Sequence, residues 1–100
     1  MNKISYEQRV QTYTNALTHF GKTNQLVVAL EELSECQKEI CKTMRGDSNL
    51  DHLAEEIADA TIMLEQVRLI FNLNDLVCER MDEKVKRLDG KLKGVREDGK

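Results

Sequence analysis

The residues HLAEEIADATIML, 52–64, are expected to form a helix, because their apolar members recur at helical spacing. They belong to a stripe that repeats every three or four positions: Leu53, Ile57, Ala60, Leu64, Val67 and Phe71. Ile62 and Met63 add apolar groups on other sides of the same helix. A helix that is apolar nearly all round needs burial on nearly all sides, which one small chain hardly provides. We therefore expect this helix to be central in an oligomer; the alternative is a monomer with an exposed apolar patch.

Three further helices are predicted around this one, which indicates an all-α, four-helix bundle-like fold. Ser5 caps the first, with Gln8 at the capping-box position, and Gly21 ends it. Thr23 or Asn24 is the expected cap of the second. The predicted helices cover about 5–20, 24–44, 50–71 and 75–88 or 75–92. Two of them carry apolar stripes expected to face inward. In the second helix the stripe is Leu26, Leu30, Leu33, Ile40 and Met44, interrupted by Gln37. In the fourth it is Val77, Met81, Val85, Leu88 and Leu92.

Length and composition limit the classes of protein to which this chain can belong. Residues 1–92 are predicted as one domain, and the charged, glycine-containing segment 93–100 as a flexible tail. The net charge of −3 offers no basic patch, so a nucleic-acid polymer is not expected as a partner. The chain shows no membrane-length apolar stretch, and MNKISYEQRV lacks the apolar centre of a signal peptide. We expect a cytoplasmic protein without membrane contact.

Two pairs of carboxylates are the candidate functional residues. Glu32 and Glu35 are three residues apart, as are Glu56 and Asp59, so each pair projects from one side of its helix. The sequence places no Lys or Arg three or four residues from Glu56 or Asp59, so no intrahelical ion pair explains them. Two like charges on the most apolar helix of the chain are costly unless a cation offsets them. A metal site is the physical alternative to two solvated helix faces.

The donor types favour a particular class of metal. All four residues offer carboxylate oxygens, which suit Mg²⁺ or Mn²⁺ better than zinc or copper. Mg²⁺ in proteins is usually coordinated by a few carboxylates together with phosphate oxygens of the substrate. Such a site therefore indicates a nucleotide or pyrophosphate substrate. Helical di-iron proteins require Glu-x-x-His on two helices, and neither His19 nor His52 has a Glu three residues earlier. Acid pairs at this spacing are also common on solvated faces, so periodicity leaves both interpretations open.

The spacing between the two pairs carries a family resemblance. Glu31-Glu32-x-x-Glu35, followed after twenty residues by Glu56-x-x-Asp59, resembles the EExxE…ExxD signature of the all-α NTP pyrophosphatases, the MazG-like superfamily. Three segments are similar to family segments in the same order: FGKTNQLVVALEELSE (20–35), LAEEIADATIMLEQV (53–67) and KVKRLDGKL (84–92). The likeness covers about residues 5–92, and the double motif is much more specific than either half.

The resemblance implies an activity and an assembly. It implies Mg²⁺-dependent hydrolysis of a nucleoside triphosphate between the α and β phosphates, giving the monophosphate and pyrophosphate, with Mn²⁺ as a substitute metal. It also implies central helices that pair across a homodimer or homotetramer. A role in clearing non-standard nucleotides from the cell is one expectation. The alternative from another class is a non-catalytic helical oligomerisation or adaptor module of the same fold.

The resemblance also assigns roles to individual residues of this chain. The implied metal ligands are Glu32, Glu35, Glu56 and Asp59, and Glu35 or Glu31 is the implied general base. Lys84 and Arg87, or Lys91, would contact phosphates. Gln25, His19 and Phe20 precede the acidic motif where relatives often line the base pocket. Charged residues on a solvated helix and a surface histidine are the competing interpretations of Lys84, Arg87 and His19.

Overall fold

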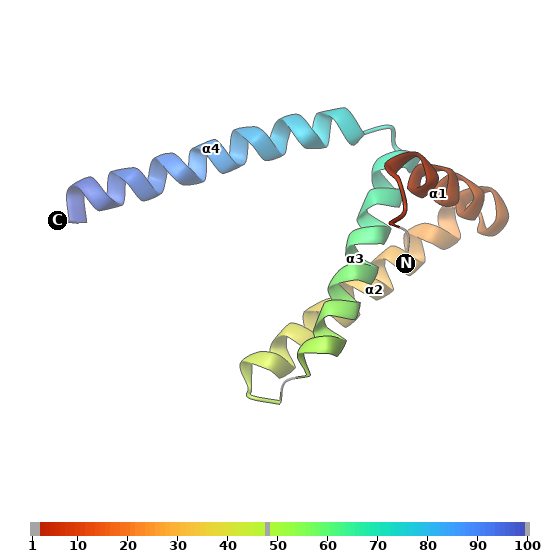
Figure 1. Ribbon diagram of the computed structural model, residues 1–100, viewed down its shortest axis with the longest axis horizontal. Coiled ribbons are helices and arrows are strands. Elements are labelled where there is room, and N and C mark those ends of the chain that lie inside the picture. Colours follow the sequence, from red (N-terminus) through yellow and green to blue (C-terminus); the bar gives the residue numbers. More distant parts are fainter. Residues whose placement is uncertain (1–2, 48, 100) are drawn as a thin grey trace.

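Four α-helices make up the described part of the chain, residues 3–47 and 49–99 of the computed structural model, with side chains described as far as residue 94 (Figure 1). They are α1 (Tyr6–Phe20), α2 (Lys22–Met44), α3 (Leu50–Ile70) and α4 (Asn74–Gly99). Those two ranges contain no strand, so the all-α prediction is confirmed. Within them, no helix combines the length and apolar character needed to cross a membrane.

The first helix begins with the predicted side-chain cap, whereas the second helix begins without one. The Ser5 hydroxyl accepts a hydrogen bond from the Gln8 backbone N–H, and the Gln8 side chain accepts one from the Ser5 backbone N–H, so the predicted capping box is confirmed. The predicted cap of α2 at Thr23 or Asn24 is wrong. Gly21 has a φ of 90°, which turns the chain so sharply that α2 starts at once at Lys22 without a side-chain cap.

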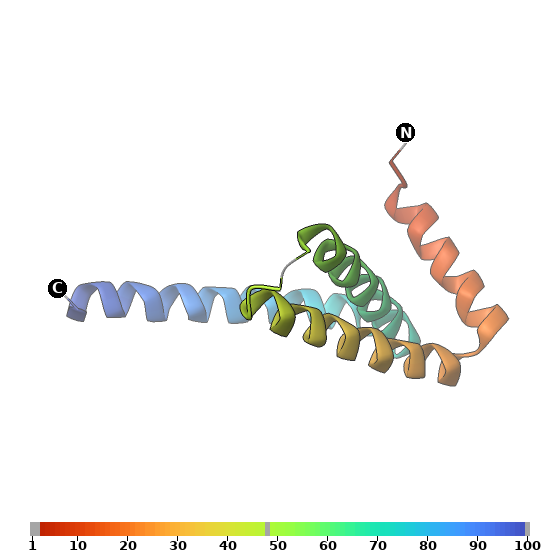
Figure 2. The same ribbon diagram turned by 90° about the horizontal axis from the view of Figure 1, so that it is seen from below.

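The helices α2 and α3 form an antiparallel hairpin that positions the acidic residues. The chain reverses after α2 at Gly46, whose φ is 85°. The Asn49 side chain then accepts a hydrogen bond from the His52 backbone N–H at 3.1 Å and caps α3. Figures 1 and 2 both show α2 and α3 side by side along most of their lengths, with α1 crossing them near the C-terminal end of α3.

The fourth helix does not pack along the hairpin of α2 and α3. After Asn72, with a φ of 54°, α4 contacts the end of α3 and then runs away from α2 and α1 (Figures 1 and 2). Its predicted end at Leu88 or Leu92 is wrong, because the helix continues to Gly99, with an ion pair of 2.8 Å between Asp89 and Lys93 one turn apart. The radius of gyration is 17.3 Å, against about 13 Å for a compact domain of this length.

The apolar stripes of the helices remain largely uncovered within one chain. The stripe of α2 was predicted to face inward, but Leu30 is 68% exposed and Met44 is 82% exposed. The inward prediction is wrong within the chain because α2 turns a small and polar face toward α3 instead. The buried residues on that face are Gln25, Ala29 and Glu39. The stripe of α4 is also open: Met81, Val85, Leu88 and Leu92 are all exposed. These stripes therefore have no cover among the described residues.

Candidate metal centre

Three carboxylates meet in the seam between α2 and α3. Glu32 of α2 and Glu56 and Asp59 of α3 each offer one oxygen atom, and these three atoms lie within 4.8 Å of one another. Glu32 and Glu56 are half-buried, while Asp59 is exposed. The helical spacing explains the grouping, because Glu56 and Asp59 share one side of α3 and Glu32 lies on the face of α2 that packs against it. The structure therefore brings together three of the four predicted ligands.

The electrostatics of this cluster favour a cation. Burial raises the pKa of Glu32, and the charges of Asp59 and Glu56, followed by those of Glu35 and Glu31, raise it further. The Glu56 Oε2 atom is buried and has no hydrogen-bond partner in the part of the chain that the structure describes. Over the same residues, no Lys or Arg forms an ion pair with Glu32, Glu56 or Asp59. Converging hard oxygen donors with an unsatisfied buried oxygen fit Mg²⁺.

The other two acids of the first motif lie beside this group. Glu35 is exposed, its Oε1 atom is 3.7 Å from Lys38 Nζ, and it is not one of the three converging carboxylates. Glu31 is also exposed. Both are close enough to act on the pKa of Glu32. They therefore neighbour the cluster on its solvent side without joining it.

The predicted phosphate-binding cations lie on another element. Lys84, Arg87 and Lys91 are exposed residues of α4, the helix that extends away from the α2–α3 hairpin. Within a single chain, these three side chains therefore do not lie beside the three converging carboxylates. Their placement suits a solvated helix within the single chain, which is the competing interpretation of these charges.

The predicted base-contacting residues have mixed placements. Gln25 is buried, and its Nε2 atom donates a hydrogen bond to Gln66 Oε1 at 2.8 Å, so its side chain joins α2 to α3. His19 is exposed in the last turn of α1, where its ring meets the Phe20 ring edge to face at a centroid distance of 4.6 Å. Among the described side chains, neither His19 nor Phe20 forms a hydrogen bond or an ion pair with these acids.

Two residues near the acids were missed by sequence reasoning. His52 lies one turn before Glu56, and its Nε2 atom is 3.6 Å from Glu56 Oε1 and 3.5 Å from Glu39 Oε2. Glu39 is 5% exposed, which is rare for a charged side chain. The spacing of four residues between His52 and Glu56 was the available signal. The burial of Glu39 could be recognised only from the packing of α2 on α3.

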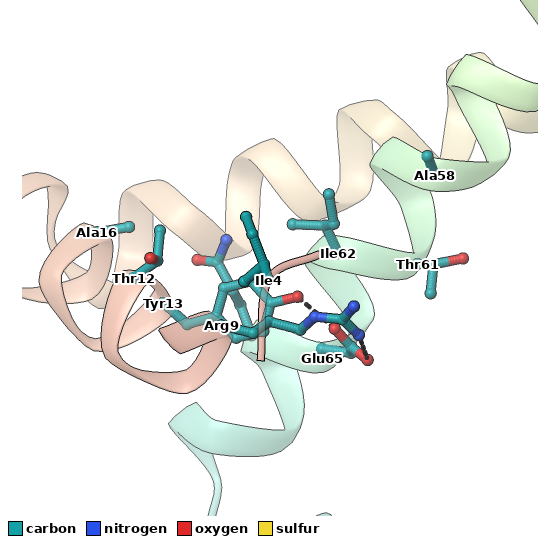
Figure 3. A pocket seen from close by; sticks show the side chains of 10 residues that line it. Ile4, Arg9, Thr12, Tyr13, Ala16, Ala58, Thr61, Ile62 and Glu65 are labelled. Atoms are coloured by element: carbon teal, nitrogen blue, oxygen red, sulfur yellow. Dashed lines mark hydrogen bonds and ion pairs between the residues drawn. The ribbon is translucent and has the colours of Figure 1, made fainter. Parts of the chain in front are cut away.

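A separate cavity of about 510 Å³ opens on the side of α3 that faces α1 (Figure 3). Its walls are mainly apolar and include Ile4, Ala16 and Ile62. At one end, the Tyr13 hydroxyl donates a hydrogen bond to Glu65, which also pairs with Arg9 at 3.4 Å. None of the three converging carboxylates lines this cavity. The network at Glu65 joins α1 to α3 and thereby fixes the position of the N-terminal helix.

Tyr13 is expected to titrate well above an ordinary tyrosine. Burial, the hydrogen bond to Glu65 and the charge of that carboxylate raise the pKa of Tyr13 from 10.0 to about 12. Because the neutral hydroxyl is favoured in the folded state, the stability it adds is present below pH 10 and is lost as the pH rises toward 12. Tyr13→Phe should remove the late component from the ultraviolet titration curve and lower the free energy of unfolding at neutral pH by about 1–2 kcal/mol. An unchanged titration curve in this variant would contradict the assignment.

The resemblance to the MazG-like superfamily stays a prediction that rests on the double sequence motif. Three acids of that motif converge in the structure. Comparison of the chain with protein-family models, with curated proteins and with solved structures finds no match.

Proposed function

We propose that this protein is a Mg²⁺-dependent nucleoside triphosphate pyrophosphohydrolase of the MazG-like type. The observation that carries the proposal is the convergence of Glu32, Glu56 and Asp59 in the helical seam, with one buried oxygen of Glu56 unpartnered. The same residues form most of the sequence motif that resembles the family. A solvated pair of helix faces would not leave a carboxylate oxygen buried and unsatisfied.

In this proposal some of the acids bind the metal ion and another accepts a proton. Glu32, Glu56 and Asp59 would hold Mg²⁺, with Glu35 on the next turn of α2 as a further ligand. The bound ion supplies charge neutralisation on the phosphates and lowers the pKa of a water molecule. Glu35 or Glu31, both exposed beside the cluster, would accept the proton of the attacking water. Without a cation, this group of carboxylates would repel a triphosphate.

We also propose that the active form is a homodimer or homotetramer in which the helices complete a MazG-type bundle between copies. The exposed stripes of α2 and α4 support this, because large uncovered apolar surfaces mark interfaces. The extended course of α4 would carry Lys84 and Arg87 to the acids of a second copy. In that arrangement the predicted phosphate contacts are made across the interface.

The cysteines support an intracellular setting for this activity. Cys36, Cys41 and Cys78 are all free. Free cysteines are usual where thiols are kept reduced. We therefore propose that the enzyme acts in the cytoplasm on the nucleotide pool.

The proposed function is tested by incubating the protein with a panel of NTPs and dNTPs in the presence of Mg²⁺ and identifying the products. A monophosphate and pyrophosphate in equal amounts are expected. Release of orthophosphate with a diphosphate left behind would contradict the assigned cleavage position. No turnover of any nucleotide, in a protein that still self-associates, would instead favour a non-catalytic oligomerisation module.

A further inference from the structure

The strongest feature beside the three converging carboxylates is a histidine that lies near Glu39, Glu55 and Glu56, of which only Glu56 belongs to that group. His52 lies in the first turn of α3, where the Asn49 side chain fixes its backbone N–H. Its Nε2 atom is 3.5 Å from Glu39 Oε2 on α2 and 3.6 Å from Glu56 Oε1 on α3. The imidazole thus bridges a buried carboxylate and a carboxylate of the candidate metal centre.

The buried carboxylate of Glu39 holds the His52 imidazole in place. Glu39 is 5% exposed, and within residues 3–47 and 49–94 the only basic side chain paired with it is His52. A buried carboxylate costs several kcal/mol unless a nearby group compensates it. The buried acid therefore keeps the imidazole on the α2–α3 seam, although the His52 side chain is 47% exposed and could otherwise turn to water.

The two oxygens of Glu56 have different surroundings. Oε1 faces the His52 imidazole, whereas Oε2 is buried and without a partner among the described residues. An N–H at Nε2 is present in the imidazolium and in one neutral tautomer, so the contact does not require a change of protonation. The histidine engages one oxygen and leaves the other available.

We propose that His52, backed by Glu39, is a positioning residue that fixes the carboxylate of Glu56 for the binding of a divalent cation. The inference rests on the proposed function, because it takes Glu56 to be a ligand of Mg²⁺. Carboxylate ligands are commonly held by a partner that does not touch the metal, and loss of such a partner weakens metal binding by about 10–100-fold. His52 and Glu39 have that relation to Glu56.

The experiment measures Mg²⁺ binding by calorimetry and thermal unfolding in EDTA. His52→Leu should weaken Mg²⁺ binding by about 10–100-fold, while His52→Gln, which keeps an N–H donor, should retain most of the affinity. His52→Leu also strands the buried charge of Glu39 and should melt at a lower temperature. The double variant Glu39→Gln/His52→Leu removes that charge and should recover stability without recovering Mg²⁺ affinity. Asp51→Asn, an exposed change in the same helical turn, serves as the control and should bind Mg²⁺ like the wild type.

The outcomes separate positioning from simple support of the fold. Wild-type Mg²⁺ affinity in the double variant would overturn the positioning role and leave the proposed function intact. A wild-type protein that binds no Mg²⁺ would overturn the proposed function, and the positioning role with it. Weak Mg²⁺ binding in the double variant, with restored melting temperature, supports the inference.

Discussion

Glu56→Gln should lower the turnover of the preferred nucleoside triphosphate by about 100-fold or more. Glu56 lies where three carboxylates converge, and one of its oxygens is buried without a partner. Loss of about 3 kcal/mol of charge stabilisation in the transition state corresponds to roughly this factor. Asp59→Asn should have a similar effect for the same reason. The measurement is the initial rate of pyrophosphate release at saturating nucleotide and Mg²⁺.

The melting temperature gives an independent readout of the same change. Mg²⁺ should raise the melting temperature of the wild type, because it binds the folded state preferentially. Glu56→Gln and Asp59→Asn should lose most of this response, while the repulsion that raises the pKa of Glu32 is relieved. Asp51→Asn is the control, since Asp51 lies in the first turn of α3 but is exposed and outside the cluster. Equal Mg²⁺ responses in all these variants would refute the role of the acids as ligands.

In the proposed oligomer, Val85→Asp should convert the assembly into monomers. Val85 is 62% exposed in the single chain and belongs to the uncovered stripe of α4. Its replacement by aspartate should therefore change the free energy of unfolding of the single chain little. In an interface, by contrast, a buried charge without a partner weakens association by several kcal/mol. Light scattering after size exclusion should give a mass near 11.5 kDa for the variant and a multiple of it for the wild type. Lys86→Asp, one residue further along α4, should leave the mass of the assembly unchanged.

A mixing experiment tests whether α4 acts on a neighbouring copy. The double variant Lys84→Ala/Arg87→Ala and the single variant Glu56→Gln should each be nearly inactive alone. If the cations of one copy complete the acidic site of the other, half of randomly mixed dimers contain one intact site. Mixing should then restore about a quarter of wild-type activity. A mixture that stays as inactive as its components would show that each copy uses its own α4.

The sequence was sufficient for those features that depend on local spacing. The capping box at Ser5 and the break at Gly21 follow from local hydrogen bonding and backbone geometry, and both are present. The meeting of Glu56 and Asp59 on one side of α3 follows from helical periodicity. The approach of Glu32 to them was predicted from the family signature, since periodicity alone does not determine how two helices pack.

Features that depend on tertiary packing were predicted less well. The apolar stripe of α2 was expected to face inward, yet Leu30 is open while Gln25 and Glu39 are buried. Hydrophobic periodicity identifies a face that needs cover, but it does not say whether that cover comes from the same chain. The same limit explains why His52 was missed, because its importance arises from a buried acid on the opposite helix.

Anomalous diffraction from crystals soaked in Mn²⁺ tests whether acids of α2 and α3 together bind one cation. Mn²⁺ takes the same oxygen donors as Mg²⁺. The expected result is an anomalous peak about 2–2.5 Å from carboxylate oxygens of Glu32, Glu56 and Asp59. A fully occupied peak elsewhere on the molecule, with none between these three side chains, would contradict a cation site in the seam between α2 and α3.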